Sequence, residues 1–485
     1  MAQIPPKADG KPVNAELPAA LSIPARTQSV WFLTLVCLVA SLGGLLFGFD
    51  TAVISGTVGS VEAQYHLSKL QVGWFTSSAL VGCVLGAIFA GGLGDRFGRK
   101  PILMLSAVFL FVSALYSAIP RTYEILIAAR LIGGVGVGIA SVLAPLYISE
   151  FSPPRLRGRL VATYQLSIVI GILAAYFSNW ALLRFAQGNP NAFGGGGVLH
   201  WTVIAETWRG MFGAEMIPGV FFFLLLFLVP ESPRWLITAG KTERGLEILT
   251  RVSGAVTARK ELTEIQAERS HLTGSLRELF QPGLRLALIV GCGLSVFGQL
   301  TGVNIVIYYG PSILEEAGFK LGSALQFQVG FGIINLIFTL LALWKIDHWG
   351  RRPLLIGGMA VVVVAQLAAA VLFPFKPATS LWIAAVLGLY MACIALSICA
   401  VIWVLTPEIF PTRLRGRAMS IATFCNWGTN TLSALLYPWY VNKFGMHTGF
   451  ATFAVICFIA TVFFWKFVPE TKGRSLEEIE SCWRR

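Results

Sequence analysis

Charged residues are scarce in this chain: Asp, Glu, Lys and Arg together make up 13% of its 485 residues. A soluble globular domain carries about 25% charged residues, so this sequence cannot cover the surface of a soluble fold. Hydrophobic residues reach 55%. They occur in runs of roughly twenty, the length that crosses a bilayer as an α-helix. The short alternating segments of a β-barrel are absent, and the sequence therefore predicts an all-α membrane protein.

Several kinds of chemical site are also missing. The eight cysteines form no CxxC pair, and all but Cys482 lie in apolar runs, so we expect no metal site. The glycine-rich stretches 91–94 and 133–138 do not follow a strand of a βαβ unit, and no Walker loop occurs, which argues against nucleotide binding. No Ser–His–Asp arrangement is suggested. We expect neither an enzyme nor a bound cofactor.

The net charge of +13 is concentrated in short segments between apolar runs, such as 96–100 and 155–159. Lys and Arg favour cytoplasmic loops, so these clusters indicate orientation and not a nucleic-acid partner. Residues 1–29 lack the layout of a cleavable signal peptide. We expect a multi-pass protein of the plasma membrane with both termini in the cytoplasm.

The apolar runs divide the chain into two halves of six predicted helices. We expect a cytoplasmic tail (1–29), a first six-helix half (30–230), a cytoplasmic linker with short amphipathic helices (231–283), a second half (284–468) and a second tail (469–485). The twelve predicted helices lie near 31–57, 70–92, 101–119, 122–147, 160–184, 208–229, 286–310, 323–345, 352–373, 380–406, 416–441 and 448–468.

Three motifs occur once in each half, at the same place relative to the predicted helices. Two duplicated halves with a site between them are typical of alternating-access carriers. The pairs are GDRFGRKP (94–101) and IDHWGRRP (346–353), Glu150 with RLRGR (155–159) and Glu408 with RLRGR (413–417), and PES (230–232) and PET (469–471).

These motifs, together with PESPRWL (230–236), GQLTGVN (298–304) and PETKGRSLEE (469–478), resemble the sugar porter family of the major facilitator superfamily. The similarity extends over nearly the whole chain in the family's order. It implies twelve transmembrane helices in two pseudo-symmetric halves that carry a monosaccharide by alternating access. We expect the protein to act as a monomer in the lipid bilayer.

Asp50 is an acidic residue inside the first apolar run, where an ionised carboxylate is costly and points to function. Its candidate partner is Arg130 in the fourth predicted helix. Arg130 nearby would favour the ionised Asp50, and its withdrawal would favour the protonated form. In proton-coupled members of the family the resemblance places an Asp at this position, and in animal facilitative glucose transporters an Asn. We therefore expect symport with a proton. The alternative is a static structural ion pair.

A sugar offers hydroxyl groups that both donate and accept hydrogen bonds, so its site needs amide and indole side chains. The polar residues below lie in apolar runs and match sugar-contacting positions of the family. Hydrogen bonds between helices are the alternative reading for each residue taken singly. The predicted sugar contacts are Gln165, Gln299, Asn304, Asn335, Trp403, Asn426, Trp427 and Asn430, with Phe47, Tyr308 and Tyr309 as aromatic lining or outer gate.

Charged residues recur at the cytoplasmic ends of matching helices in both halves. Basic loops alone would serve as topology signals, but the repeated acidic residues favour a gate of Glu–Arg pairs that closes the cytoplasmic side. The predicted gate residues are Asp95, Arg96, Arg99, Glu150, Arg157, Glu231, Arg234, Asp347, Arg351, Glu408, Arg415 and Glu470.

The sequence departs from the family at two positions that concern the substrate. Gly298 and Ile172 stand where many sugar porters have a Gln. The loss of two amides predicts a drier, roomier pocket, so the particular sugar stays open. A carrier of a polyol, a cyclitol or an organic ion, an uncoupled sugar facilitator, and a sensor that binds sugar without transport remain as alternatives.

Overall fold

The computed structural model describes residues 30–153, 156–268, 276–281, 284–410 and 414–472, with only the backbone given at a few helical positions such as Asp347. The described ranges contain helices and no β-strand. Eleven helical stretches among them are long and apolar enough to cross a membrane. The all-α membrane fold predicted from the sequence is confirmed.

The first half begins with α1 (Val30–Val53), which the 3-10 turn η1 (Ile54–Gly56) continues. The long helices of the first half have 20 to 32 residues. They span about 30 to 48 Å, enough to cross a hydrocarbon core of about 30 Å. The remaining spans are α3 (Lys69–Phe97), α4 (Arg99–Ala118), α5 (Tyr123–Phe151), α6 (Arg157–Gly188) and the pair α8 (Thr207–Gly213) and α9 (Met216–Leu226). Shorter elements connect them: α2 (Val58–Tyr65), η2 (Ala192–Gly195), α7 (Gly197–Leu199) and the π-helical turn η3 (His200–Ala205).

The second half repeats this order, but two of its spans are broken into successive helices. The first span consists of α13 (Leu284–Leu300) and α14 (Val303–Glu316), and the fourth of α17 (Ser380–Leu396) and α18 (Ile398–Glu408). The others are α15 (Leu321–Trp349), α16 (Arg351–Leu372) with η5 (Phe373–Phe375), α19 (Arg415–Phe444) and α20 (Met446–Phe467).

Helix α19 is not among the eleven apolar stretches, although its 30 residues are long enough to span a membrane. It carries buried amides, Asn426 and Asn430, at positions that a lipid-facing helix would fill with apolar side chains. With α19, each of the twelve predicted spans is helical in the structure.

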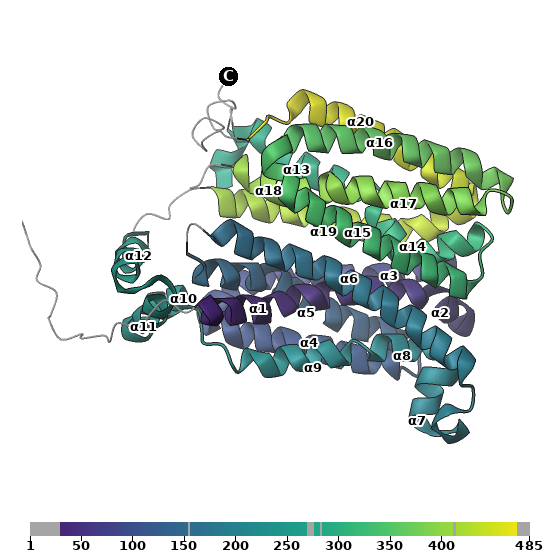
Figure 1. Cartoon of the computed structure of the whole chain (residues 1–485), viewed down its shortest axis with the longest axis horizontal. Helices are drawn as coiled ribbons and strands as arrows, with labels where there is room; N and C mark the ends of the chain where they lie inside the picture. The colour runs from purple at the N-terminus through teal and green to yellow at the C-terminus, as the bar shows by residue number, and fades with distance from the viewer. Residues whose placement is uncertain (1–29, 154–155, 269–275, 282–283, 411–413, 473–485) are drawn as a thin grey trace, which may run out of the picture.

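The segment between the halves folds into α10 (Pro233–Thr238), α11 (Thr242–Ser253), α12 (Ala255–Glu268) and the 3-10 turn η4 (Leu276–Phe280). The first three helices share a small apolar core that includes Ile237, Leu249 and Ala258. The guanidinium carbon of Arg251 lies 4.0 Å from the ring centroid of Phe32, which fastens α11 to the start of α1. Figure 1 shows α10–α12 at the left end of the bundle, opposite α7, and these two ends are called the α10 end and the α7 end.

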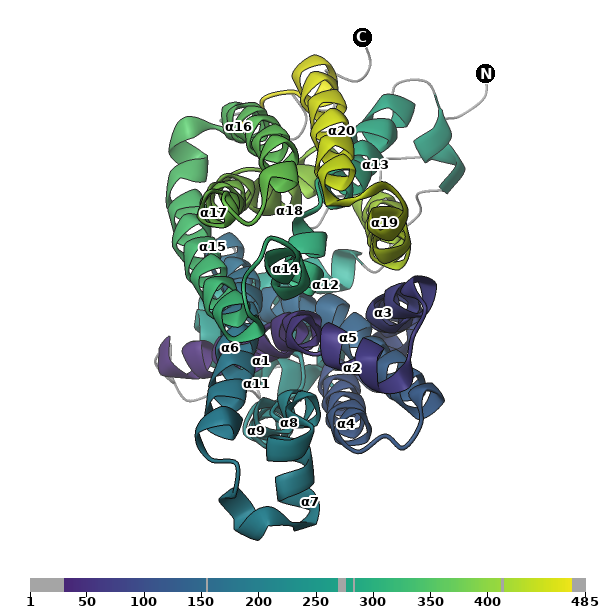
Figure 2. The ribbon, with the colours of Figure 1, turned by 90° about the vertical axis from the view of Figure 1, so that its right-hand side faces the viewer.

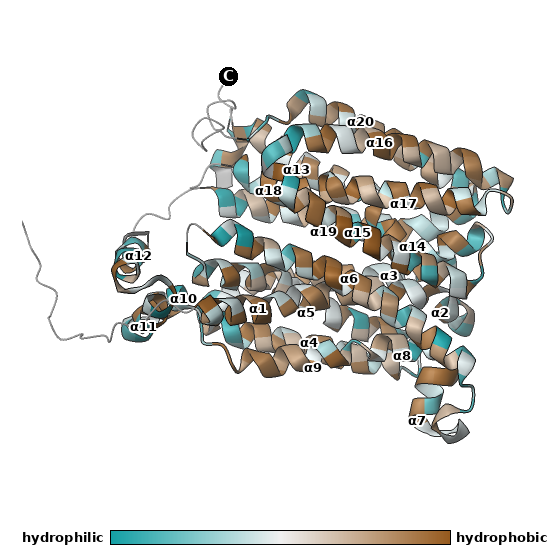
Figure 3. Ribbon diagram, in the orientation of Figure 1, coloured by the Kyte–Doolittle hydropathy of each residue, from teal (hydrophilic) through white to brown (hydrophobic). Residues whose placement is uncertain are grey.

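The two halves form two layers of nearly parallel helices, which Figure 1 shows as the purple-to-blue and the green-to-yellow layers. They meet through α3 with α19, α6 with α15, and η1 with α14, and Figure 2 shows α14 between the layers. A Cβ on Gly73 of α3 would lie 1.9 Å from the carbonyl oxygen of Leu435 in α19. Figure 3 shows the hydrophobic colour along the helices and the hydrophilic colour gathered mostly at their ends.

Gly98 ends α3 and begins α4 with φ of +102°, a backbone conformation that residues with a side chain rarely adopt. A Cβ at this position would also lie 2.3 Å from a carboxylate oxygen of Glu231. We therefore expect Gly98→Ala to lower the stability of the detergent-solubilised protein by about 2 kcal/mol or more, measured as a fall in melting temperature.

Gly92→Ala is the matched control, because Gly92 lies inside α3 and a Cβ there meets nothing within 4 Å. Alanine is the better helix former, so this variant should melt at or slightly above the parent temperature. Equal losses in both variants would contradict the role assigned to the Gly98 turn.

Candidate functional site

Asp50 and Arg130 meet in the interior of the first half. Asp50 lies near the end of α1 and Arg130 in α5, and each is 2% exposed. One guanidinium nitrogen of Arg130 donates to the Asp50 carboxylate at 2.5 Å, and another donates to the Asp50 carbonyl oxygen at 3.4 Å. The guanidinium carbon also lies 5.4 Å from the ring centroid of Phe212. The structure thus places the two residues of the predicted coupling pair in direct contact in the buried interior of the first half.

Glu215 is a third charged residue of this site, and the sequence analysis missed it. It lies between α8 and α9, is 1% exposed, and has Asp50 and Arg130 as its electrostatic neighbours. One of its carboxyl oxygens has no hydrogen-bond partner. A signal was available, because Glu215 is the one acidic residue in the sixth apolar run and an ionisable residue inside the membrane is a functional candidate by default.

Three predicted sugar-contacting residues and one predicted lining residue, Tyr308, form two hydrogen-bonded pairs on α13, α14 and α19. The amide nitrogen of Asn304 donates to the amide oxygen of Gln299 at 2.5 Å. The amide nitrogen of Asn430 in α19 donates to the hydroxyl of Tyr308 in α14 at 3.0 Å. Within each pair the two side chains are already hydrogen-bonded to each other. A sugar hydroxyl that bound here would therefore replace an existing hydrogen-bond partner.

Two further aromatic contacts involve predicted lining residues. The rings of Phe47 in α1 and Trp427 in α19 have centroids 5.6 Å apart, so this pair joins the two halves of the molecule. Tyr309 donates from its hydroxyl to the carbonyl oxygen of Ala434 at 2.9 Å and packs against Tyr437. Both arrangements agree with an aromatic lining, and that role stays a prediction.

The other predicted sugar contacts lie on four different helices. Gln165 is half-buried on α6, and Asn426 is buried on α19. Asn335 is buried on α15 and accepts a hydrogen bond from Thr339 of its own helix at 3.5 Å. Trp403 on α18 has an exposed fraction of 45%. Their common role in binding a sugar stays a prediction.

The structure does not show a roomier pocket at the two positions that lack the family's Gln. A Cβ on Gly298 would lie 3.1 Å from Ile402, so the α18 side chain fills the space. Ile172 is 6% exposed on α6, where its backbone nitrogen lies 2.9 Å from the position of a Cβ on Gly48 of α1. Position 298 is therefore packed with hydrocarbon and position 172 is part of the contact between α1 and α6.

The helix break between α13 and α14 is held by side chains from three other spans. Gly302 has φ of +86°, which frees the carbonyl oxygen of Thr301 from helical bonding. That oxygen accepts hydrogen bonds from Gln366 at 3.2 Å and Tyr390 at 3.0 Å, and the Cys457 thiol lies 3.9 Å away. The sequence analysis treated this span as one unbroken helix.

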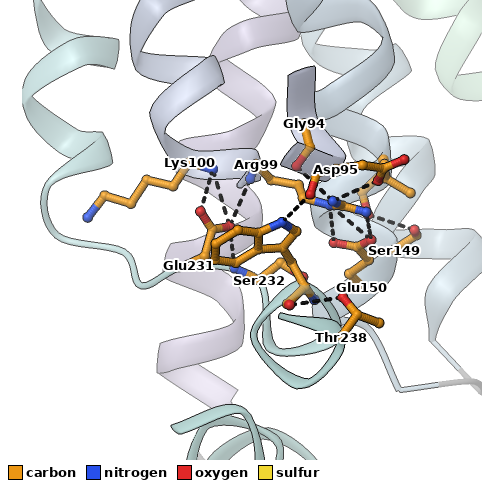
Figure 4. Close-up of polar contacts among 11 residues, drawn as sticks. Gly94, Asp95, Arg99, Lys100, Ser149, Glu150, Glu231, Ser232 and Thr238 are labelled. Atoms are coloured by element: carbon orange, nitrogen blue, oxygen red, sulfur yellow. Dashed lines mark hydrogen bonds and ion pairs between the residues drawn. The ribbon is translucent and has the colours of Figure 1, made fainter. Parts of the chain in front are cut away.

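The charged residues at the α10 end of the first half form one compact cluster, which Figure 4 shows. Arg99 donates to Glu150, the closest approach being 3.0 Å, and pairs with Asp95 at 3.0 Å. The Glu231 carboxylate accepts from the backbone N–H groups of Arg99 at 3.0 Å and Lys100 at 3.1 Å, where the unpaired N–H groups of the α4 N-terminus lie. Burial raises the pKa of Glu231, and these N–H groups act to lower it.

The second half builds the same cluster from its own copy of the motifs. Arg351 donates to Glu408 at 3.3 Å, and Glu470 accepts from the backbone N–H groups of Arg351 and Arg352, each at 3.1 Å. The hydroxyl of Thr471 also donates to Glu408 at 2.6 Å. Both clusters therefore join spans within one half, and their role as a cytoplasmic gate stays a prediction.

The other predicted gate residues are placed as follows. Arg96 lies over the ring of its neighbour Phe97 at 5.1 Å, and Arg415 donates to the carbonyl oxygen of Phe410 at 3.5 Å. Arg157 at the start of α6 and Arg234 in α10 both lie near Glu261 of α12. Burial raises the pKa of Glu261 and the two arginines oppose that shift. The side chain of Asp347 lies outside the described part of the chain.

The chain matches the family described as "Sugar (and other) transporter" over residues 36–483. It is 40% identical to the arabinose-proton symporter of Bacillus subtilis over 459 residues, which covers 94% of this chain and 96% of that protein. It is 37% identical to the D-xylose-proton symporter of Escherichia coli over 484 residues, which covers 92% of this chain and 95% of that protein.

Solved structures with the same fold include the E. coli xylose transporter in a partially occluded inward open conformation. That structure is 34% identical, has a TM-score of 0.78, and covers 92% of this chain and 99% of its own. The proton:xylose symporter of the major facilitator superfamily bound to 6-bromo-6-deoxy-D-glucose is 35% identical with a TM-score of 0.74, over 93% of this chain and 99% of its own.

The two charged clusters predict unequal effects of the same substitution. The side chains of Arg99 and Glu150 are 11% and 7% exposed, whereas Glu408 is 27% exposed and Arg351 13%. Removing Glu150 takes away the buried partner of Arg99 and leaves its exposed pairing with Asp95, and the cost of losing a charged partner rises with burial. We expect Glu150→Gln to cost about 3 kcal/mol of stability and Glu408→Gln clearly less, read from melting curves of the two purified variants. Equal losses would contradict this ranking.

Proposed function

Because this chain belongs to the sugar porter family of the major facilitator superfamily, we propose that it carries a monosaccharide across the membrane together with a proton. The observation that carries this proposal is the buried group of Asp50, Arg130 and Glu215. The similarity to arabinose-proton and xylose-proton symporters supports it.

The charges of this group suit the binding of one proton. Arg130 stays protonated, so it balances one of the two carboxylates, and the second carboxylate is neutral only when it holds a proton. Two carboxylates close together in a buried site do not both stay ionised easily. In the conformation described here Arg130 is bound to Asp50, which leaves Glu215 as the carboxyl group that holds the proton. Movement of Arg130 away from Asp50 during the cycle would shift that preference.

The sugar binds at the seam between the halves in this proposal. Gln299, Asn304 and Asn430 supply amide donors and acceptors for its hydroxyl groups, and Phe47 with Trp427 supplies an aromatic surface from both halves. Rocking of one half against the other about this site gives alternating access. The Glu–Arg clusters at the α10 end are the cytoplasmic gate.

The orientation follows from the basic residues. The loops between α3 and α4 and before α6 carry Arg and Lys at the α10 end, and such loops remain in the cytoplasm. We place the α10 end, both termini and the linker helices on the cytoplasmic side of the plasma membrane. The protein works as a monomer in the bilayer, without a nucleic-acid partner.

A carrier of a polyol or cyclitol is the second candidate. The packing of Ile402 against Gly298 and the buried Ile172 support it, because these positions offer hydrocarbon where other family members offer an amide. A panel of labelled monosaccharides, polyols and cyclitols in the transport assay below separates the two candidates.

We expect Asp50→Asn to abolish accumulation against a gradient while sugar-for-sugar exchange continues. The substitution removes one of the two carboxylates, so Arg130 and an ionised Glu215 balance each other without a proton. The measurement is uptake of labelled sugar into proteoliposomes with and without an inward proton gradient, followed by counterflow at equal pH.

The control for Asp50→Asn is Glu124→Gln, the same type of change at an exposed carboxylate at the start of α5. It should accumulate sugar like the parent. If the parent only equilibrates sugar and Asp50→Asn behaves identically, the protein is a facilitator and the Asp50–Arg130 pair is structural.

We expect Gln299→Ala to raise the KM for the transported sugar about tenfold, the loss that corresponds to one hydrogen bond in a dry site. The control is Gln326→Ala, because Gln326 is an exposed amide on α15. Initial rates of uptake at several sugar concentrations give the KM of each variant. An unchanged KM in Gln299→Ala would remove this residue from the site.

A further inference from the structure

Ser113 and Ser117 are two buried serines of α4 whose hydroxyl groups have no hydrogen-bond partner. They are 1% and 0% exposed, and their spacing of four residues places them on one face of the helix. A buried serine in a membrane helix ordinarily donates to a nearby carbonyl oxygen. Ser78 does so to Phe75 at 3.0 Å, and Ser106 of α4 donates to Gly136 at 3.0 Å. The two unpartnered hydroxyl groups therefore differ from their neighbours.

Ser113 lies next to the charged group. Both it and Asp50 approach the position that a Cβ on Gly133 would occupy: the Ser113 hydroxyl oxygen lies 2.3 Å from that point and a carboxylate oxygen of Asp50 3.8 Å. Gly133 is thus the residue of α5 that lets the α4 hydroxyl approach the α1 carboxylate.

Ser117 extends this line of polar groups toward the α7 end. The next residue, Ala118, has its Cβ 3.5 Å from the position of a Cβ on Gly213, which is two residues before Glu215. Beyond Ala118, the carbonyl oxygen of Pro120 accepts from Arg209 at 2.8 Å. Helix α4 packs against both α8 and α9, which flank Glu215.

Four polar atoms of this region lack a partner in the structure: the hydroxyls of Ser113 and Ser117, one nitrogen of Arg130 and one oxygen of Glu215. Buried polar groups are almost always paired, by protein atoms or by internal water. A group of such atoms between α4, α5 and the α8–α9 junction is a place where internal water can bind.

We propose that Ser113 and Ser117, with internal water, conduct the proton between water at the α7 end and the carboxylates of Asp50 and Glu215. Each hydroxyl oxygen accepts a proton from the side of the α7 end and releases its own proton toward the carboxylate, so each serine remains neutral. The water outside loses one proton and one carboxylate becomes a carboxyl group. This inference rests on the proposed proton coupling.

The test compares Ser113→Ala/Ser117→Ala with Ser106→Ala, a substitution on the same helix at a buried serine whose hydroxyl already has a partner. Reconstituted proteins are assayed for initial proton-driven sugar uptake and for counterflow at equal pH, which needs no net proton movement. We expect the double variant to lose about tenfold or more in proton-driven uptake and to keep parental counterflow. Ser106→Ala should keep both activities.

The outcomes separate the inference from the proposed function. If the parent accumulates sugar and the double variant accumulates it equally fast, the serines only allow close helix packing and the proton path is wrong. A fall in counterflow that equals the fall in proton-driven uptake also overturns it, because the defect is then in folding or sugar binding. A parent without proton-driven accumulation refutes the proposed symport itself.

Discussion

A guanidinium can be kept inside a lipid bilayer only beside opposite charge, and the first half of this protein is arranged around that constraint. Arg130 is among the largest fully buried side chains of the described structure. It is bound to Asp50 of the first span, and the buried Glu215 of the sixth span lies within its electrostatic field. Close helix contacts enclose this group. A Cβ on Gly48 would lie 1.9 Å from a carbonyl oxygen of α6, and one on Gly134 would lie 1.9 Å from a carbonyl oxygen of α3. Helices that approach through glycine leave little room for lipid or water, so the charges depend on one another.

The two halves use the same positions for different physical tasks. In the first half, the first, fourth and sixth spans supply Asp50, Arg130 and Glu215 to one centre. In the second half, the same three spans meet at the carbonyl oxygen of Thr301 in the first span, which Tyr390 of the fourth span and Cys457 of the sixth span contact. Gln366 of the third span also donates to this oxygen. The counterpart of Gln366 in the first half is Ser113, which likewise lies in the third span. One copy of the duplicated fold therefore holds charges and the other holds a helix break.

Much of this architecture follows from local sequence. Runs of about twenty apolar residues and repeated loop motifs are sufficient for twelve spans in two halves, and Asp50 stands out because it lies in such a run. The break at Gly302 was not predicted, because it depends on Tyr390 and Gln366 far along the chain. The packing of Ile402 against Gly298 was missed for the same reason: one helix compensates for volume lost on another. Glu215 is predictable as the one acidic residue in the sixth apolar run, although it belongs to none of the repeated motifs.

The carboxylates of Glu231 and Glu470 accept hydrogen bonds from backbone N–H groups of the basic loops. Every amino acid except proline supplies that N–H. At Lys100 and Arg352 this contact uses the backbone N–H and not the side chain, so it does not by itself fix which residue stands there. These side chains can then diverge independently in the two halves, while the contacts between each carboxylate and its backbone N–H groups stay the same.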